Sequence, residues 1–277
     1  MTFDFARPED REQLIELYDL CFPGEHEYAV WFHENVRCRY RTLVYREDGR
    51  VVSMIDLIDT ALEKNGEQMK AVYLYAVATR PQCRGRGIMG EMIEYTFDLL
   101  RREGTELAVL LTQNDSLFRF YDRFGFRSVF SVSEVTANAD MPAFLCKARL
   151  LDETDVKSVY ALYHAAIQGR AAVFRDEERF AEILEEYEGH AYGLFDQQGT
   201  LLSYALMDEE DKRAVEVIGY GCNYLLYVCT MDEKSCRGRT LPTGRNDIST
   251  GCARALTDRA EAFLRDGLPP YLNVLYN

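Results

Sequence analysis

The feature that most constrains this chain is a glycine-rich loop between an apolar, strand-like segment and a long amphipathic segment. The loop covers residues 82–90 and reads QCRGRGIMG. Glycines allow tight turns and a close approach of the backbone to a ligand. Successive N–H groups then point into the loop, and the helix that follows adds a partial positive charge at its N-terminus. The loop therefore predicts a pyrophosphate site, with Arg84 and Arg86 as nearby cations.

The segments around the loop alternate between strand and helix patterns. The pattern predicts helices within the first forty residues, and strands and helices thereafter in the order strand 42–45, strand 51–58, strand 71–77, helix 88–103, strand 106–112, helix 115–124 and strand 126–135. In the long helix, Met92, Ile93, Phe97 and Leu100 recur on one face, and Gly104 ends it. This order predicts an α/β (α+β) fold.

Gly85, Gly87 and Gly90 also spell G-x-G-x-x-G, the pattern of dinucleotide-binding proteins. A dinucleotide fold brings its first strand directly into the first glycine, whereas here the polar segment 79–84 intervenes. It also expects an acidic residue at the end of the next strand, and Glu103 and Glu106 precede that strand. A nicotinamide oxidoreductase is therefore an alternative that these residues do not favour.

The second half of the chain weakly repeats the first. The hairpin pattern of residues 43–51 returns at 193–201, and the strand 71–74 returns at 214–217. The second copy has Cys236-Arg237-Gly238-Arg239 where the first has its glycine loop, but Leu241 and Pro242 follow at once, so no phosphate-binding helix begins there. We predict a working domain over residues 1–140 and a degenerate copy over residues 141–277.

Charge and composition exclude several classes of partner. The formal net charge of −14 argues against nucleic acid, because such binders need a basic face. No apolar run reaches the length of a membrane span and the first residues are polar, so we expect a cytoplasmic protein without membrane contact. The eight cysteines contain no C-x-x-C pair and the four histidines form no ligand run, so we expect no metal site.

Two motifs at the right separation resemble the GNAT N-acetyltransferase superfamily. Its loop pattern, Q/R-x-x-G-x-G/A, is present as residues 82–87 after the strand end Val77-Ala78. Its second element is present as Asn114, then Tyr121, then Gly125-Phe126. The resemblance implies a GNAT fold, in which helices flank a mixed central sheet, followed here by a degenerate GNAT-like second domain.

The resemblance also implies acetyl-CoA as the acyl donor and assigns roles to residues. Backbone groups of Val77, Ala78 and Thr79 would pair with the pantetheine arm, and their N–H groups could hold the oxyanion. Asn114 would steady the same arm. The pyrophosphate would be wrapped by Arg84, Gly85, Arg86, Gly87, Ile88, Met89 and Gly90. Tyr121 would protonate the leaving thiolate as a general acid; the alternative for Tyr121 is a packing aromatic beside Phe118, Phe120 and Phe124.

The general base is not evident, because residues 72–76 of the strand before the loop contain no acid. The tandem layout and the segments 251–256 and 270–277 resemble the enhanced-intracellular-survival type of aminoglycoside acetyltransferase, in which the terminal carboxylate enters the active site. That resemblance makes the carboxylate of Asn277 a candidate base. The chain is too short for the third domain of that group, and the alternative is that its end forms an edge strand.

The acceptor pocket is expected near the first two helices. Phe22, Glu25 and Trp31 are candidate linings, because an aromatic group and an acid suit a cationic amine; a single tryptophan is also common in cores. We predict an N-acetyltransferase that acts on the amine of a small molecule or side chain. The alternatives are a protein N-acetyltransferase and a catalytically silent acyl-CoA-binding module, and a homo-oligomer is left open.

Overall fold

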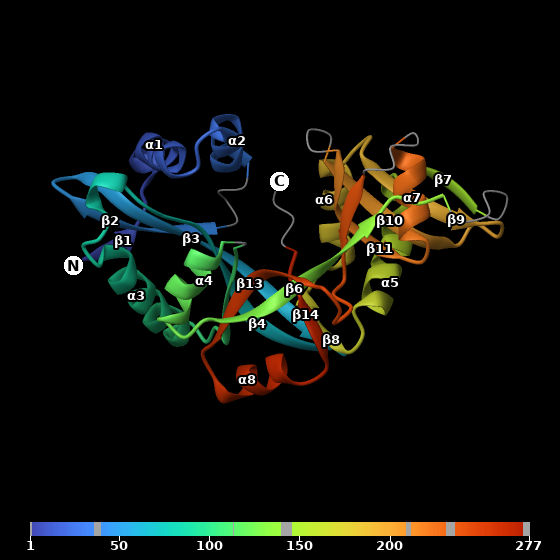
Figure 1. The fold of residues 1–277 in the computed structure, drawn as a ribbon. Helices are drawn as coiled ribbons and strands as arrows, with labels where there is room; N and C mark the ends of the chain where they lie inside the picture. The colour runs from blue at the N-terminus through green and yellow to red at the C-terminus, as the bar shows by residue number, and fades with distance from the viewer. Residues whose placement is uncertain are drawn as a thin grey trace.

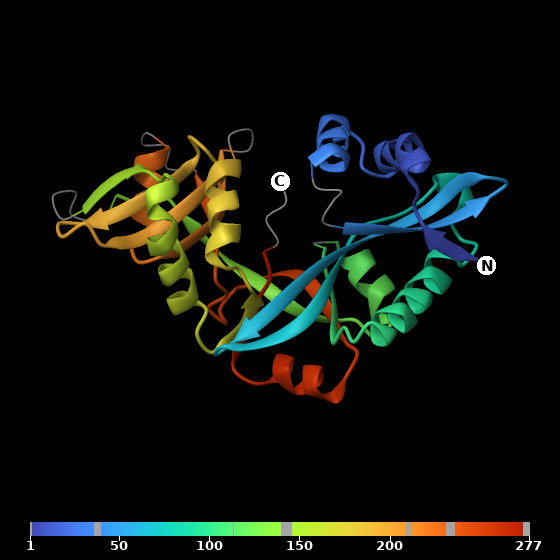
Figure 2. The same ribbon diagram turned by 180° about the vertical axis from the view of Figure 1, so that it is seen from behind.

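In a computed structural model of the chain, the described residues are 2–35, 40–112, 114–139, 146–208, 212–230 and 236–273. They form two α/β halves that lie beside each other, the first blue to green and the second yellow to orange (Figures 1 and 2). Helices flank a mixed sheet that runs through both halves. This confirms the predicted fold class. None of the helices in these ranges is long and apolar enough to cross a membrane.

The first half follows the predicted order of elements, except that residues 3–5 form a strand where helices were predicted, and the strands between residues 40 and 79 are longer than predicted. Its elements are β1 (Phe3–Phe5), α1 (Arg11–Cys21), α2 (His26–Asn35), β2 (Tyr40–Glu47), β3 (Arg50–Lys64), β4 (Glu67–Thr79), α3 (Ile88–Arg102), β5 (Leu107–Leu111), α4 (Asp115–Asp122) and β6 (Arg127–Thr136). Strands β1 to β4 are antiparallel, whereas β4 and β5 run parallel with α3 as the crossover between them. The long helix predicted at residues 88–103 is confirmed.

Helix α3 is held on the sheet by its apolar face. Met92, Ile93, Phe97 and Leu100 are all fully buried, in one cluster with side chains of β3, β4 and β5. Burying each of these side chains stabilises the fold by roughly 1.5–3 kcal/mol. The helix start, and with it the glycine loop, is thereby fixed against the sheet.

Strands β4 and β5 are paired over only part of their length. Three parallel residue pairs join them, from Ala71–Leu107 to Tyr73–Val109, although both strands continue further. The pairing of β3 with β4 also slips by one residue near Ala76, whose φ of 44° marks a β-bulge. After Tyr73 the two strands therefore part.

The second half contains a smaller, related arrangement. Its elements are β7 (Cys146–Leu150), α5 (Val156–Ala166), β8 (Arg170–Val173), α6 (Glu177–Glu186), β9 (Ala191–Asp196), β10 (Leu201–Asp208), β11 (Arg213–Gly219), α7 (Cys222–Cys229), β12 (Arg237–Thr240), β13 (Ile248–Ala255), α8 (Asp258–Arg265) and β14 (Leu268–Tyr271). The repeated hairpin predicted at residues 193–201 forms β9 and the start of β10, and the repeated strand predicted at residues 214–217 lies in β11. Leu194, Tyr204 and Val217 lie in the cores of this half.

The sequence places the counterpart of the glycine loop at residues 236–239, whereas the structure has the corresponding turn elsewhere. Residues 237–240 form strand β12, in which Gly238 lets the strand approach β11: a Cβ at this residue would lie 2.8 Å from Val217. The turn that leads from strand to helix, as the loop does in the first half, is instead Gly219-Tyr220-Gly221 before α7. This turn is too short to form a loop like that of residues 80–87, so the second half has no counterpart of the glycine loop at this position.

The two halves share strands. β13 lies between β5 and β6 of the first half, antiparallel to both, and β8 and β14 join the far end of β3. Strand β6 pairs with β13 through residues 127–132 and with β12 through residues 133–136. It therefore joins the strands of the two halves into one sheet (Figure 1). The boundary near residue 140 stays a prediction, because residues 140–145 lie outside the described ranges.

Candidate active site

The glycine loop connects β4 to α3 in the conformation that its sequence predicts. Gly85 and Gly87 have φ values of 78° and 81°, a left-handed conformation that glycine adopts without strain. Gly87 is the N-cap residue immediately before α3. Gly90 lies inside the helix, where a Cβ would come within 3.2 Å of Phe124. Gly85 and Gly87 thus allow the turn, and Gly90 allows α3 to pack closely against Phe124.

A cavity of about 670 Å³ extends along this loop. It is lined by all the predicted cofactor-binding residues except Asn114, together with Cys21, Phe22, Cys83, Leu117, Phe120, Tyr121 and Arg123. We call it the loop cavity. Its wall combines apolar side chains, a helix N-terminus and several cations, which suits a ligand that joins an apolar arm to phosphates.

The arginines of the loop cavity are not equivalent. Arg86 forms an ion pair with Glu47 at the end of β2, and hydrogen bonding from Arg86 lowers the pKa of the Glu47 carboxyl. Arg84 donates to the backbone oxygen of Thr79 at 3.0 Å, and Arg123 lies over the rings of Phe120 and Phe124. Within the described ranges, neither Arg84 nor Arg123 has a carboxylate within 4.0 Å. They are therefore the cations available to an anion, and sequence reasoning missed Arg123.

Asn114 has a structural role at the start of α4. Its Oδ1 accepts a hydrogen bond from the backbone N–H of Ser116 at 2.8 Å, as an N-cap residue does. It is not among the described residues that line the cavities. Its predicted contact with the CoA arm stays a prediction.

Tyr121 lies on α4 where β4 and β5 part. Only 6% of the residue is exposed, and its ring contacts Phe120 and Phe126 edge to face. Burial raises the pKa of its hydroxyl above the usual range, so the proton is retained at neutral pH. Within the described residues the hydroxyl has no hydrogen-bond partner. Packing and proton donation are therefore compatible in this tyrosine.

A second cavity, of about 660 Å³, opens on the other side of Tyr121. It shares Phe22, Val77, Leu117 and Tyr121 with the loop cavity, so the two meet at these residues. Residues 73–77 of β4 and 110–112 at the end of β5 line it, which places it between the parted strands. We call it the acceptor cavity.

Glu25 and the tyrosines beside it form one wall of the acceptor cavity. The Tyr18 hydroxyl donates to the Glu25 carboxylate at 2.8 Å and lies 2.9 Å from the hydroxyl of Tyr75. Burial raises the pKa of Tyr18 and of Tyr75 well above the usual range. Of the predicted acceptor residues, Phe22 and Glu25 line the cavity, whereas Trp31 stacks beside Tyr28 at 5.8 Å and packs against the neighbouring core.

The opposite wall of the acceptor cavity comes from the second half of the chain. It consists of Asp208, Arg213, Val215, Arg239 and Asn273. Sequence reasoning assigned none of these residues to the site. No local motif marks them, because their position depends on how β10, β11 and β12 are placed beside the first half.

Asn273 is held at the cavity by a buried ionic network. Its side-chain amide donates to Glu216 at 2.9 Å, and its backbone oxygen accepts from Arg175 at 2.7 Å. Glu216 also accepts from Tyr204 and Tyr271 at 2.7 and 2.6 Å. Asn277, the predicted base, lies outside the described residues, so its role stays a prediction.

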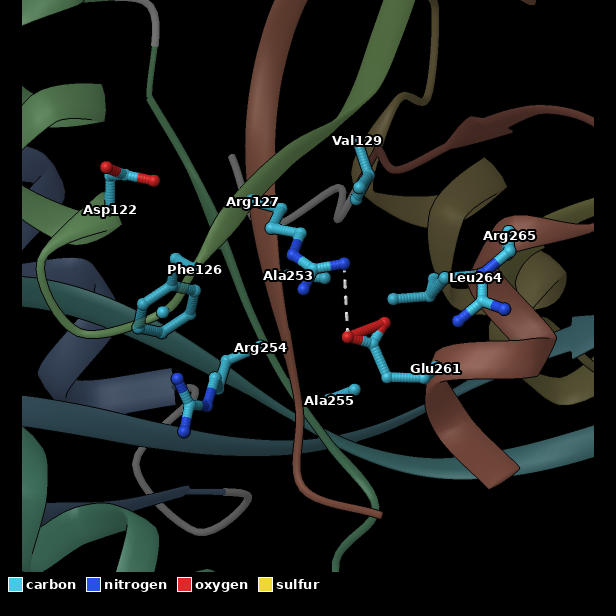
Figure 3. Close-up of a pocket in the computed structure, with 11 residues that line it drawn as sticks. Asp122, Phe126, Arg127, Val129, Ala253, Arg254, Ala255, Glu261, Leu264 and Arg265 are labelled. Carbon is cyan, nitrogen blue, oxygen red and sulfur yellow. Dashed lines mark ion pairs between the residues drawn. The ribbon is translucent and has the colours of Figure 1, made fainter. Parts of the chain in front are cut away.

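A third cavity, of about 410 Å³, shares no lining residue with the other two. Figure 3 shows it between α4, β6, β13 and α8, with the Arg127–Glu261 ion pair at 3.2 Å across its opening. Arg254 fills the space above Gly125 and donates to the backbone oxygen of Phe124 at 2.9 Å. Arg127 and Arg254 thus have partners within the fold, and we assign this cavity no role.

Four features together define the fold class of the N-acetyltransferases that use acyl-CoA. They are the bulge in β4, the separation of β4 from β5, the glycine loop and helix α3. Residues 2–129 match the family model described as an acetyltransferase (GNAT) domain, and this part of the chain belongs to the GNAT superfamily. No curated protein is significantly similar to the chain in sequence.

Solved structures share this fold across most of the chain. A GCN5-related N-acetyltransferase from Kribbella flavida has a TM-score of 0.69 at 13% identity, over 94% of this chain and 73% of that one. Eis1 from Mycobacterium abscessus has a TM-score of 0.64 at 13% identity, over 96% and 76%. A tandem GNAT protein from the clavulanic acid biosynthesis pathway has 0.59 at 13% identity, over 92% and 99%. The similarity covers both halves, in keeping with a degenerate GNAT-like second domain.

Proposed function

We propose that this protein transfers the acetyl group of acetyl-CoA to an amine. The observation that carries the proposal is the meeting of two cavities at Tyr121, one along the phosphate-binding loop and one between the two halves. The donor thioester would reach Tyr121 from the loop cavity, and the amine would reach it from the acceptor cavity. This arrangement brings two substrates together in one orientation.

The transfer needs few groups from the protein. The amine nitrogen would attack the thioester carbonyl carbon, the carbon–sulfur bond would break, and the amine proton would pass to a base. The Tyr121 hydroxyl, which retains its proton at neutral pH, would protonate the departing thiolate. The loop glycines, Arg84 and Arg123 would bind the phosphates of the donor. The proposed acceptor is a small molecule or a side chain of a protein.

Ligand-dependent stability tests the donor first. Thermal unfolding is measured with acetyl-CoA, CoA and NAD, each at a saturating concentration. We expect selective stabilisation by the two CoA ligands, on the order of 2 to 4 kcal/mol. Stabilisation by NAD alone would contradict the proposal and favour a nicotinamide oxidoreductase.

Turnover separates an enzyme from a silent binding module. Release of the CoA thiol is followed with a panel of small amines and lysine-containing peptides. Amine-dependent thiol release, with acetylated product found by mass spectrometry, is the expected result. Stabilisation by CoA without release for any amine would indicate the binding module instead.

A further inference from the structure

Arg239 stands in the acceptor cavity, on the wall opposite Glu25. It lies on the short strand β12, between β6 and β11, and its side chain is half-buried. The same residue also lines a smaller cavity of about 330 Å³ beside Asn273, which continues from the acceptor cavity. Its guanidinium therefore borders the space that an acceptor would occupy.

The described part of the chain gives Arg239 no counter-charge within 4.0 Å. Glu134 is the residue opposite Arg239 in the β12–β6 register, but its carboxylate pairs with Arg237 at 3.7 Å. Asp208, the acid on the same cavity wall, lies 3.9 Å from Arg213. Arg239 thus differs from Arg86 and Arg175, whose charges are matched by Glu47 and Glu216.

The surroundings of Arg239 destabilise its positive charge unless an anion lies nearby. Burial lowers the pKa of Arg239, and repulsion from Arg213 lowers it further. An arginine nevertheless stays protonated at neutral pH. The guanidinium of Arg239 in the wall of a partly enclosed cavity attracts an anionic group, which it can bind through two parallel hydrogen bonds.

The Glu25 wall favours the opposite charge. The Glu25 carboxylate accepts a hydrogen bond from Tyr18, and Glu25 lines the cavity together with tyrosines and Phe22. A carboxylate and aromatic faces suit an ammonium group. The acceptor cavity therefore presents a cationic wall on the second half and an anionic, aromatic wall on the first.

We propose that the acceptor is an amine that also carries an anionic group, a carboxylate or a phosphate, which Arg239 binds. This inference rests on the proposed acetyl transfer and names the class of its acceptor. A polycationic amine would instead place positive charge beside the guanidinium of Arg239, which disfavours it by repulsion. Arg239 is thus a specificity-determining residue supplied by the second half.

Matched acceptor pairs test the proposal and distinguish the two anions. Thiol release is measured with phenylalanine against phenylalaninamide, and with phosphoethanolamine against ethanolamine. We expect kcat/KM to be at least about tenfold higher for the anionic member of one pair, the effect of losing a hydrogen bond to a charged group. Preference in the first pair indicates a carboxylate, and preference in the second a phosphate. Equal or faster turnover of both neutral members would overturn the inference.

Variants assign the preference to Arg239. In Arg239→Ala the ratio of kcat/KM between the anionic and neutral acceptors should fall to about one, and Arg239→Lys should retain part of it. Arg237→Ala is the matched control, because this exposed arginine lies on the same strand and pairs with Glu134. A preference that survives in Arg239→Ala would contradict the assignment.

Binding without the donor separates this inference from the proposed function. Calorimetric titration of the anionic amine into the wild-type protein and into Arg239→Ala reports acceptor binding alone. Binding that depends on Arg239, without any stabilisation by acetyl-CoA, would support the anion site and overturn the acetyl transfer. Acetylation of neutral amines only would keep the acetyl transfer and overturn the anion site.

Discussion

The guanidinium of Arg175 and the carboxylate of Glu216 face each other through two hydrogen bonds, at 2.7 and 3.0 Å, in the interior of the second half. Glu216 is fully buried and Arg175 is 3% exposed. Burial raises the pKa of the Glu216 carboxyl, but Arg175 and the tyrosine hydroxyls more than offset this, and the pKa is lowered. The pair therefore stays charged and holds Asn273 beside the acceptor cavity.

Removing one member of this pair should destabilise the protein strongly. In Glu216→Ala the buried Arg175 loses its partner, and we expect the free energy of unfolding to fall by roughly 3–5 kcal/mol. Urea denaturation measures it. Glu67→Ala is the control, because the Glu67–Arg259 pair is about half-exposed on both sides and its removal should change the free energy of unfolding far less. Similar losses in the two variants would contradict the prediction.

Tyr121→Phe should separate catalysis from binding. The ring and its packing stay, whereas the proton donor is lost, so we expect turnover to fall at least about tenfold. Stabilisation by acetyl-CoA should remain as in the wild type. Thiol-release kinetics and thermal unfolding on the same samples measure both quantities, and unchanged turnover would remove Tyr121 from the mechanism.

Gly87→Ala should damage the loop cavity specifically. Alanine at a φ of 81° costs roughly 1–2 kcal/mol, and the strained loop should lose affinity for acetyl-CoA. Gly49→Ala in the β2–β3 turn is the matched control, with a φ of 79° and open space around the added Cβ. Both variants should lose similar unfolding free energy, while isothermal titration should show weaker acetyl-CoA binding only in Gly87→Ala. Unchanged affinity in Gly87→Ala would exclude the loop from the donor site.

The Glu16–Arg80 pair predicts a dependence of stability on pH. Hydrogen bonding from Arg80 lowers the pKa of Glu16 from 4.5 to about 2. A lowered pKa means that the carboxylate contributes stability above its unfolded pKa and loses it as the pH falls from 4.5 through about 2. Since Glu16 is half-exposed, we expect about 1 kcal/mol, measured by urea denaturation of the wild type against Glu16→Gln. A difference that does not shrink in acid would contradict the assignment.

The loop cavity could be predicted from residues 77–90 because its geometry is local. Gly85 and Gly87 adopt conformations that glycine favours, and the periodicity of α3 identifies the face that anchors it. Tyr121 was instead selected through its place in the motif shared with the GNAT superfamily, and tertiary packing of α4 brings it to the loop cavity. Motif and spacing are sufficient where neighbours in the chain form the site.

The acceptor cavity was less predictable from the sequence. Glu25 and Phe22, predicted because they adjoin the first helices, line this cavity, whereas the partly buried Trp31 packs against a core cluster. Residues 236–239 resembled a degenerate glycine loop, but Arg237 to Arg239 form part of strand β12, because the pairing partner of a strand is not encoded within the strand itself.

The sequence by itself determined most elements of the first half and the conformation of the glycine loop, because backbone preferences and hydrophobic periodicity act over a few residues, whereas Tyr121 was related to the loop only through the family resemblance. Only the tertiary structure decided that β13 enters the sheet between β5 and β6, and that Arg239 and Asn273 face Tyr121 across one cavity. These contacts join residues more than a hundred positions apart. They depend on strand register between elements far apart in the chain and on the buried Arg175–Glu216 network that holds Asn273 at the cavity.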